Sequence, residues 1–222
     1  MKTDGSLSNG WKPESKRRVA AVAGLLAALA LAACGGAPRM YYYTLRMPAP
    51  PARSDPKTAF ALGVEHFRAP EMLRDDRILY YQSPTEMNFY EYHRWGSDPA
   101  SMFSDLALGW IQGTGVFTEA RMLPAREPVD YILRGRLEHF EEVDEAGGSK
   151  GRVGVELTLL RSSDHKVVWS DRRQAESAVE EKGVAGVVQA LNESSQQLLR
   201  EALPGMIEQV EREYKSSQGP TP

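Results

Sequence analysis

The chain has 222 residues, of which 41% are hydrophobic and 26% are charged. This length and composition fit one ordinary globular domain, or one and a half, and they exclude a collagen-like, a disordered and a polytopic membrane protein. Lys and Arg number 27 against 30 Asp and Glu, so the net charge of −3 does not favour nucleic acid as a partner. A single cysteine excludes a disulfide framework and a cysteine-rich zinc site.

Residues 1–33 have the pattern of a secretory signal peptide. A polar stretch ends in Lys16, Arg17 and Arg18, and the apolar run Val19–Leu31 follows it. A basic start, a short apolar region and small residues before a cleavage site are typical of such signals. The run of 13 residues is shorter than the roughly 20 that a membrane-spanning helix needs. A short membrane anchor or a buried helix is the less favoured interpretation.

The cysteine follows this signal directly. Residues 31–34 read Leu-Ala-Ala-Cys and resemble the bacterial lipobox, in which the cysteine is diacylated and then becomes the first residue. The thiolate is the nucleophile that accepts the lipid. We therefore expect Cys34 to carry diacylglycerol and an N-acyl chain as covalent lipids, and we expect no other cofactor. By resemblance to the sorting rule of enterobacteria, Gly35 fits onward transfer to the outer membrane.

Cleavage before Cys34 leaves 189 of the 222 residues. The leader takes five basic and two acidic residues with it, so the mature chain has a net charge of −6. Such a chain offers no polybasic patch for anionic headgroups, and the lipid must hold it at the membrane. We expect a protein on the periplasmic face of the outer membrane.

Composition and periodicity divide the chain into four segments. Four prolines between Met47 and Lys57 are typical of an extended linker. The expected segments are a signal peptide over 1–33, a connecting stretch over 34–58, one folded domain over 59–214, and a disordered tail over 215–222. The connecting stretch contains the lipidated cysteine, a first short strand and the linker.

The expected elements follow in chain order. Aromatic and alternating apolar residues predict strands over 41–45, 60–66, 77–82 and 88–95, the last two forming a hairpin around 83–85. Asp98 as N-cap and Pro99 at the first helical position predict a helix that ends at 113–115. Three longer strands are expected over 128–142, 153–159 and 166–174, with turns at 146–151 and 162–165.

A long amphipathic helix is expected from about Gly183. Pro204 and Gly205 should kink or break it, because proline lacks the amide donor and clashes one turn back. The order of elements predicts an α+β fold: a single domain with a mostly antiparallel sheet of about six to seven strands and two helices packed on it, the second long and C-terminal.

The sequence contains few candidates for chemistry. The histidines at 66, 93, 139 and 165 have no metal-ligand spacing, and no Gly-x-Ser-x-Gly motif is present. Glu141, Glu142 and Glu145 are expected to form a solvated strand edge. We therefore predict a protein that is not an enzyme, with no catalytic residue and no metal.

Aromatic residues crowd the predicted hairpin at Tyr80, Tyr81, Phe89, Tyr90, Tyr92 and Trp95. Half of them must point away from a core on one face, because strand side chains alternate. Either the hairpin is buried on both faces, or these side chains contact another protein, for which Tyr and Trp are favoured anchors. The candidate contacts with a partner or a second copy are Tyr90, Tyr92, Trp95, Met206, Ile207 and Val210.

Several short segments recur here in the order and spacing of a known family. They are 42–45 (Tyr-Tyr-Thr-Leu), 77–80 (Arg-Ile-Leu-Tyr), 92–95 (Tyr-His-Arg-Trp) followed by Pro99, 106–117, and 130–140. Over about residues 41–203 the sequence resembles the ABC-type transport auxiliary lipoproteins. One departure is the segment 69–73, which lacks the aromatic residue usual before the second hairpin.

The resemblance implies a non-enzymatic outer-membrane lipoprotein that works with a mammalian-cell-entry (MCE) protein and an ABC permease and ATPase. Such systems move phospholipid or other hydrophobic molecules between the two membranes. In the paraquat-inducible member the lipoprotein forms a ring that receives the end of the MCE needle, so a homo-oligomeric ring is expected here. The alternative is a lipoprotein that assembles an envelope or β-barrel complex, and the third and least favoured is a periplasmic hydrolase.

Overall fold

The computed structural model describes residues 38–48, 50 and 58–218. The chain divides into two units, Met1–Arg39 and Met40–Pro222. All the helices and strands among the described residues lie in the second unit, which is one α+β domain. The expected signal peptide, the lipid site at Cys34 and most of the proline-rich linker lie outside the described residues.

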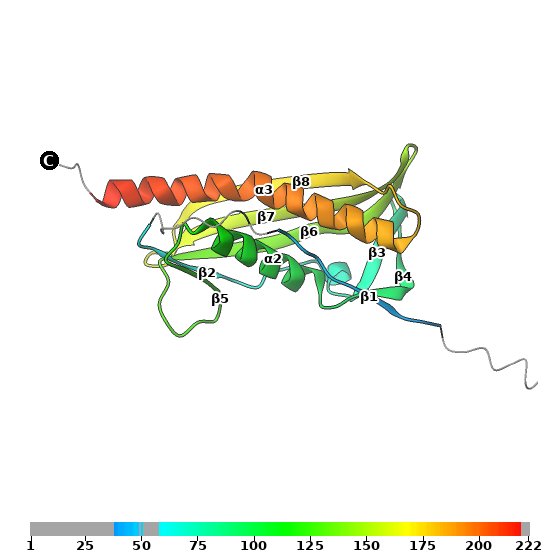
Figure 1. Ribbon diagram of the computed structural model, residues 1–222, viewed down its shortest axis with the longest axis horizontal. Coiled ribbons are helices and arrows are strands. Elements are labelled where there is room, and N and C mark those ends of the chain that lie inside the picture. Colours follow the sequence, from blue (N-terminus) through cyan, green and yellow to red (C-terminus); the bar gives the residue numbers. More distant parts are fainter. Residues whose placement is uncertain (1–37, 49, 51–57, 219–222) are drawn as a thin grey trace, which may run out of the picture. The chain divides into compact units, whose positions relative to one another are not determined.

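One sheet of eight strands forms the framework of this domain (Figure 1). The strands are β1 (Tyr41–Tyr43), β2 (Ala61–Val64), β3 (Arg77–Ser83), β4 (Glu86–Trp95), β5 (Glu119–Met122), β6 (Tyr131–Glu145), β7 (Gly148–Arg161) and β8 (Val167–Ala178). They follow the order β1-β4-β3-β6-β2-β5, and β7 and β8 extend the sheet from β6.

The sheet is mixed. The long ladders β6–β7 and β7–β8 and the β3–β4 hairpin are antiparallel, whereas β1 pairs with β4, β2 with β5 and β6, and β3 with β6 in parallel. Strand β6 is long enough to pair with β2 at residues 131–133 and with β3 at residues 142–143. The predicted α+β class is confirmed, with one strand more than the expected range and more parallel pairing. The turn expected over 146–151 is only 146–147, because β7 begins at Gly148.

Two long helices pack on one face of the sheet, α2 (Pro99–Thr114) and α3 (Val184–Ser217), and a 3-10 turn, η1 (Glu71–Leu73), precedes β3 (Figure 1). The predicted start of α2 is confirmed, since the Asp98 carboxylate accepts a hydrogen bond of 3.0 Å from the Ser101 amide. The helix ends at Gly115, whose φ of 62° is the left-handed conformation that glycine adopts without strain.

Helix α3 has 34 residues, which corresponds to a length of about 50 Å. Its buried stripe comprises Val184, Val187, Ala190, Leu191, Leu198, Leu199, Ala202, Leu203, Met206 and Val210. Gly151 of β7 allows the helix to lie directly on the sheet. A Cβ atom there would come within 2.6 Å of the Leu191 backbone nitrogen.

Of the kink or break expected at Pro204 and Gly205, the break is wrong, because α3 continues through both residues to Ser217. The missing amide donor costs a helix about 3 kcal/mol. That cost is offset because the apolar stripe on both sides of Pro204 packs in the same core. Residues 215–217, expected in a disordered tail, belong to this helix, and residues 219–222 lie outside the described part.

Candidate functional site

Three of the six candidate contact residues are buried in the core. Trp95 ends β4, and its ring packs on Phe140 with 5.0 Å between the ring centroids. Met206 and Val210 are fully buried, and Ile207 is half-buried against the same core. Trp95, Met206 and Val210 are therefore not accessible as contacts with a partner, and Ile207 is only partly accessible. An uninterrupted α3 keeps the residues beyond Pro204 on the stripe that faces the sheet.

Tyr90 and Tyr92 lie in a bulge of β4. Arg77 of β3 pairs with Arg94 and Leu79 pairs with Phe89, so one residue of β3 stands opposite four of β4. A bulge bends its strand and changes the direction of the side chains on it. Tyr90 is half-buried as a result, and Tyr92 is exposed.

The Tyr90 hydroxyl donates a hydrogen bond of 2.6 Å to the Glu142 carboxylate. Burial, followed by this hydrogen bond, raises the pKa of Tyr90. The neighbouring Glu141 is also buried and accepts hydrogen bonds from Arg152 and the Phe140 amide. The expected solvated edge is therefore wrong for Glu141 and Glu142, because Tyr90 of β4, Arg152 of β7 and the Phe140 amide supply donors that allow both carboxylates to be buried. Glu145 alone of the three is exposed.

Seven aromatic side chains gather where β1, β4 and β3 lie side by side. We call this group the aromatic edge, and it comprises Tyr41, Tyr42, Tyr43, Tyr80, Tyr90, Tyr92 and His93. Ring centroids lie 4.7 Å apart for Tyr80 and Tyr90, and 6.1 Å apart for Tyr90 and His93. Tyr41 and Tyr43 both stack on His93, at 5.0 and 5.8 Å.

His93 is the centre of the aromatic edge. Its Nδ1 lies 2.9 Å from the Tyr43 hydroxyl, and burial lowers the pKa of the imidazole, which favours the neutral ring. A neutral imidazole has one nitrogen without a proton, which can accept the hydrogen bond from Tyr43. His93 thus helps to hold β1 on β4, in addition to the three register pairs between these strands.

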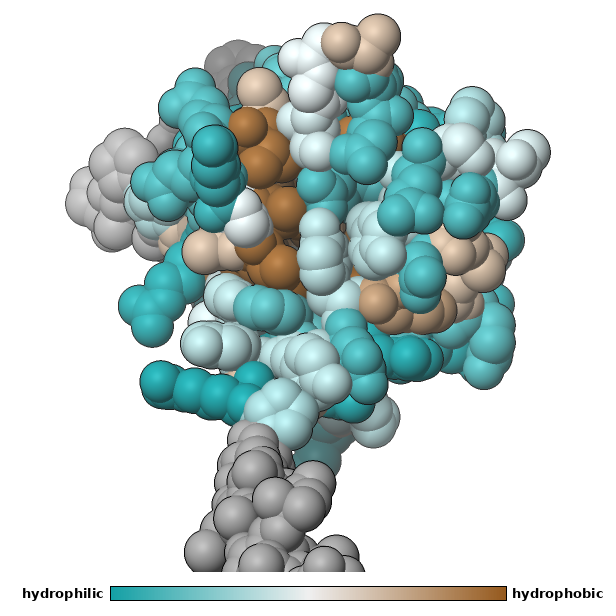
Figure 2. Space-filling view, turned by 90° about the vertical axis from the view of Figure 1, so that its right-hand side faces the viewer, coloured by the Kyte–Doolittle hydropathy of each residue, from teal (hydrophilic) through white to brown (hydrophobic). Residues whose placement is uncertain are grey.

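A small pocket of about 250 Å³ adjoins the aromatic edge. Tyr90 and Glu142 line it from the sheet, and Val179, Lys182 and Val187 line it from α3 and the segment that leads into α3. Figure 2 shows this end of the domain, where a narrow strip of hydrophobic side chains reaches the surface between polar ones.

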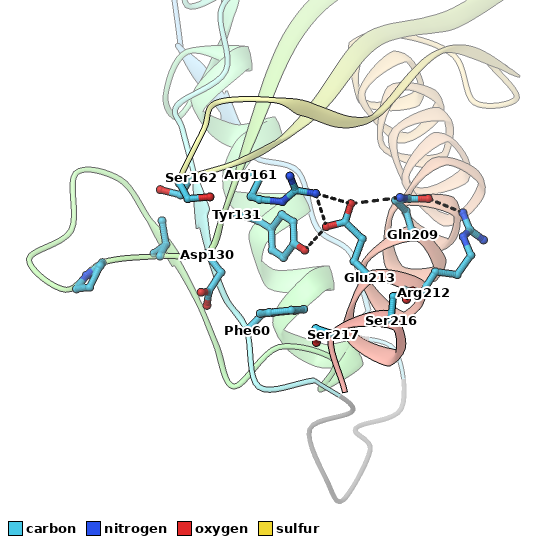
Figure 3. Close-up of a pocket in the computed structure, with 13 residues that line it drawn as sticks. Phe60, Asp130, Tyr131, Arg161, Ser162, Gln209, Arg212, Glu213, Ser216 and Ser217 are labelled. Carbon is cyan, nitrogen blue, oxygen red and sulfur yellow. Dashed lines mark hydrogen bonds and ion pairs between the residues drawn. The ribbon is translucent and has the colours of Figure 1, made fainter. Parts of the chain in front are cut away.

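A second and larger pocket, of about 880 Å³, lies between the start of β6 and the last turns of α3 (Figure 3). Glu213 of α3 accepts hydrogen bonds there from the Tyr131 hydroxyl, at 2.6 Å, and from Arg161, at 3.0 and 3.1 Å. The Phe60 ring meets the rings of Tyr131 and Tyr214 edge to face. This network ties the end of α3 to the sheet.

Glu213 and Arg161 form an ion pair in this pocket, at 3.0 Å. Burial alone would raise the pKa of Glu213, but the hydrogen bonds from Tyr131 and Arg161 outweigh burial and lower the pKa. Glu213 in turn raises the pKa of Arg161. No histidine or cysteine is among the described residues that line this pocket. The arrangement is suited to holding α3 in place.

The described part of the chain contains no group of three or more His, Cys, Asp or Glu side chains placed to hold a metal ion. His93 is in the aromatic edge, His139 contacts Glu141, and His66 and His165 are exposed. Of the helices in residues 38–48, 50 and 58–218, none is both long and apolar enough to cross a membrane.

Comparison with protein-family models places this chain in a class. Residues 43–202 match the ABC-type transport auxiliary lipoprotein component. The match covers well over half of the 222 residues, and the chain belongs to this family. It is thus an auxiliary lipoprotein component of ABC-type transport, in a family that is generally non-catalytic. No curated protein matches the sequence.

Solved structures share the fold at low sequence identity. Protein XCC0632 from Xanthomonas campestris is 19% identical with a TM-score of 0.70, over 78% of this chain and 99% of that one. The crystal structure of an uncharacterised protein is 14% identical with a TM-score of 0.60, over 76% and 99% of the two chains. The PelC dodecamer from Paraburkholderia phytofirmans is 17% identical over 69% of this chain and 95% of that one. Its TM-score of 0.40 is too low to support a conclusion about this chain.

Proposed function

We propose that this lipoprotein is anchored through Cys34 to the periplasmic face of the outer membrane. There it serves an MCE protein with an ABC permease and ATPase, which together move phospholipid or another hydrophobic molecule between the two membranes. The observation that carries the proposal is the short distance along the chain between two features. The family match begins at residue 43, nine residues after the cysteine that ends the lipobox-like segment.

The domain supports a structural role in such a system. Its core is filled by packed side chains of the sheet and the two helices. The pocket at Tyr131 has a charged lining, with Arg161, Arg212 and Glu213, which suits an acyl chain poorly. A path for a hydrophobic molecule would therefore run along surfaces that several copies provide together, in agreement with the ring that the family resemblance implies.

Photo-crosslinking in intact cells tests the partner. A photoreactive amino acid is placed at the exposed positions Met87 and Val167, one at a time, in the full-length chain. We expect crosslinks to an MCE-domain protein, identified by mass spectrometry, that disappear when Cys34→Ser is added. Crosslinks to a β-barrel assembly protein in place of an MCE protein would contradict the proposal and favour the role in envelope assembly.

A further inference from the structure

The aromatic edge concentrates exposed apolar surface in one place. Six large hydrophobic side chains are exposed in the described part of the domain, and three of them belong to this edge. Tyr42 is 67% exposed, Tyr41 43% and Tyr92 38%. The three tyrosines lie on the adjacent strands β1 and β4, with Tyr42 on the opposite face of β1 from Tyr41, so the edge exposes rings on both of its faces. Exposed apolar side chains gathered at one edge mark a surface that contacts a protein or a membrane.

These side chains are held on a rigid frame. Strand β1 keeps its register on β4 through three residue pairs, and Tyr41 and Tyr43 stack on His93. The Gly96 amide adds a hydrogen bond of 2.7 Å to the Tyr43 carbonyl. Contact with a partner would therefore require little further ordering of the edge, which lowers the entropic cost of binding.

The charges beside the aromatic edge argue against attraction to anionic headgroups. Arg94, which pairs with Tyr42 in the sheet, forms an ion pair with Asp76. Arg77 forms hydrogen bonds of 2.9 and 2.6 Å with Asp75. Both cations are matched by carboxylates, so the aromatic rings are the dominant feature of this surface.

The length of chain before β1 identifies the occupant. Tyr41 lies seven positions after Cys34, and a fully extended chain spans at most about 3.6 Å per residue. Lipid on Cys34 therefore keeps β1 within about 25 Å of the membrane surface. Tyrosine is enriched at the level of lipid headgroups, where its ring is apolar and its hydroxyl hydrated. Strand β1 is at the end of the strand order, and its outer backbone groups need water, which the headgroup layer supplies and the hydrocarbon core does not.

We propose that the aromatic edge lies in the headgroup layer of the phospholipid membrane that anchors Cys34, and that it sets the orientation of the domain on that membrane. The inference rests on the proposed anchoring. It adds a second contact to the lipid, so that the domain is fixed by β1 and β4 instead of turning freely on its tether.

Site-directed spin labelling tests this proposal on the mature lipidated chain in phosphatidylcholine vesicles. The thiol of Cys34 is consumed by lipid, so a cysteine introduced elsewhere is the only one available to the label. Tyr42→Cys probes the aromatic edge, and Val167→Cys on β8 is the matched control, because Val167 is 52% exposed. The measured quantity is the collision rate of the nitroxide with a water-soluble nickel complex, compared with its collision rate with oxygen.

We expect the label at position 42 to collide with the nickel complex several-fold less often than the label at 167, and with oxygen more often. Equal collision rates at the two positions in a chain that floats with the vesicles would overturn the proposal and leave the anchoring intact. Protection at 42 that vanishes when the protein is diluted to one copy per vesicle would also overturn it, since a second copy would then be the occupant. A chain that does not float with the vesicles would contradict the anchoring itself, and this proposal with it.

Discussion

Glu142 illustrates how single residues set the stability of this domain. Its carboxylate is only 7% exposed, and it is satisfied by the hydroxyl of Tyr90. When a buried acceptor loses its donor, no hydrogen bond compensates for the free energy of its desolvation. The pair thus joins the β4 bulge to β6 through one hydrogen bond.

Tyr90→Phe removes that donor and keeps the ring. We expect it to lower the free energy of unfolding by about 1–3 kcal/mol, because Glu142 is left buried without its partner. Tyr92→Phe is the control, since Tyr92 is exposed, and it should change the stability by less than about 0.5 kcal/mol. Urea unfolding of both variants decides the question. Equal stability of the two variants would show that the Tyr90 hydroxyl does not stabilise Glu142.

His93 predicts a pH dependence of the attachment of β1. Burial lowers the pKa of His93, so the unfolded chain binds its proton more readily than the folded chain. The folded state is therefore favoured above the unfolded value of about 6.5 and loses this contribution as the pH falls through that value. Tyr41, Tyr43 and Tyr90 surround the ring, which accounts for its burial.

We expect hydrogen exchange of the β1 amides to accelerate between pH 7 and pH 5, after correction for the intrinsic rate. The variant His93→Gln should lose most of this pH dependence, whereas His66→Gln, which replaces an exposed histidine, should keep it. If His93→Gln retains the full dependence, other groups control the attachment of β1.

At the scale of elements, the contact of α3 with β7 depends on one glycine. A Cβ atom at Gly151 would lie 2.6 Å from the Leu191 nitrogen, whereas a Cβ atom at Gly147 would have nothing within 4 Å. Gly151→Ala should therefore destabilise the domain by about 1–3 kcal/mol, the usual cost of overpacking. Gly147→Ala should be nearly neutral in the same thermal or chemical unfolding experiment. A neutral Gly151→Ala would mean that α3 can move away from the sheet without cost.

The part of α3 beyond Pro204 is as much a part of the core as the part before it. Met206→Ala should cost about 2–5 kcal/mol, through lost burial and the cavity left behind. Glu208→Ala on the exposed side of the same turn should cost less than about 0.5 kcal/mol.

Truncation after Leu203 should unfold the domain, since it removes Met206, Val210 and the Glu213 network together. A truncated chain that folds with near-normal stability would contradict this packing.

Much of the element order could be predicted from the sequence, and the failures have physical causes. Periodicity gave α2, α3 and the strands from β3 to β8 except β5, whose four residues show no alternation. The parallel pairing of β1 with β4 joins residues about 50 positions apart, which no local pattern encodes. The burial of Met206 is not predicted by the rule that proline ends helices, because here the apolar stripe continues on both sides of Pro204.

The candidate site was predicted only in part, for a related reason. The surplus of aromatic residues on the hairpin pointed to Tyr90 and Tyr92, but a bulge, and not simple alternation, decides which rings are exposed. The pattern at Tyr41–Tyr43 by itself predicts only a short strand. Three consecutive tyrosines beginning seven residues after Cys34 were the available signal for the aromatic edge.

At the scale of the whole molecule, we propose that the domain acts at the membrane where lipid on Cys34 would place it. Its family is that of auxiliary lipoproteins of ABC-type transport. The described residues supply a rigid sheet, two packed helices and an aromatic edge near the start of the mature chain. In the function proposed above, lipid attachment at Cys34 is the step on which outer-membrane location, access to an MCE partner and the orientation of the aromatic edge would all depend.

The most direct test of this account is the intact mass of the protein isolated from the membranes of cells that express the full-length chain. We predict a chain of 189 residues that begins at Cys34 and carries a diacylglycerol and an N-acyl group, together with complete loss of this species in Cys34→Ser. A mature protein that retains residues 1–33, or that begins elsewhere with an unmodified Cys34, would contradict it.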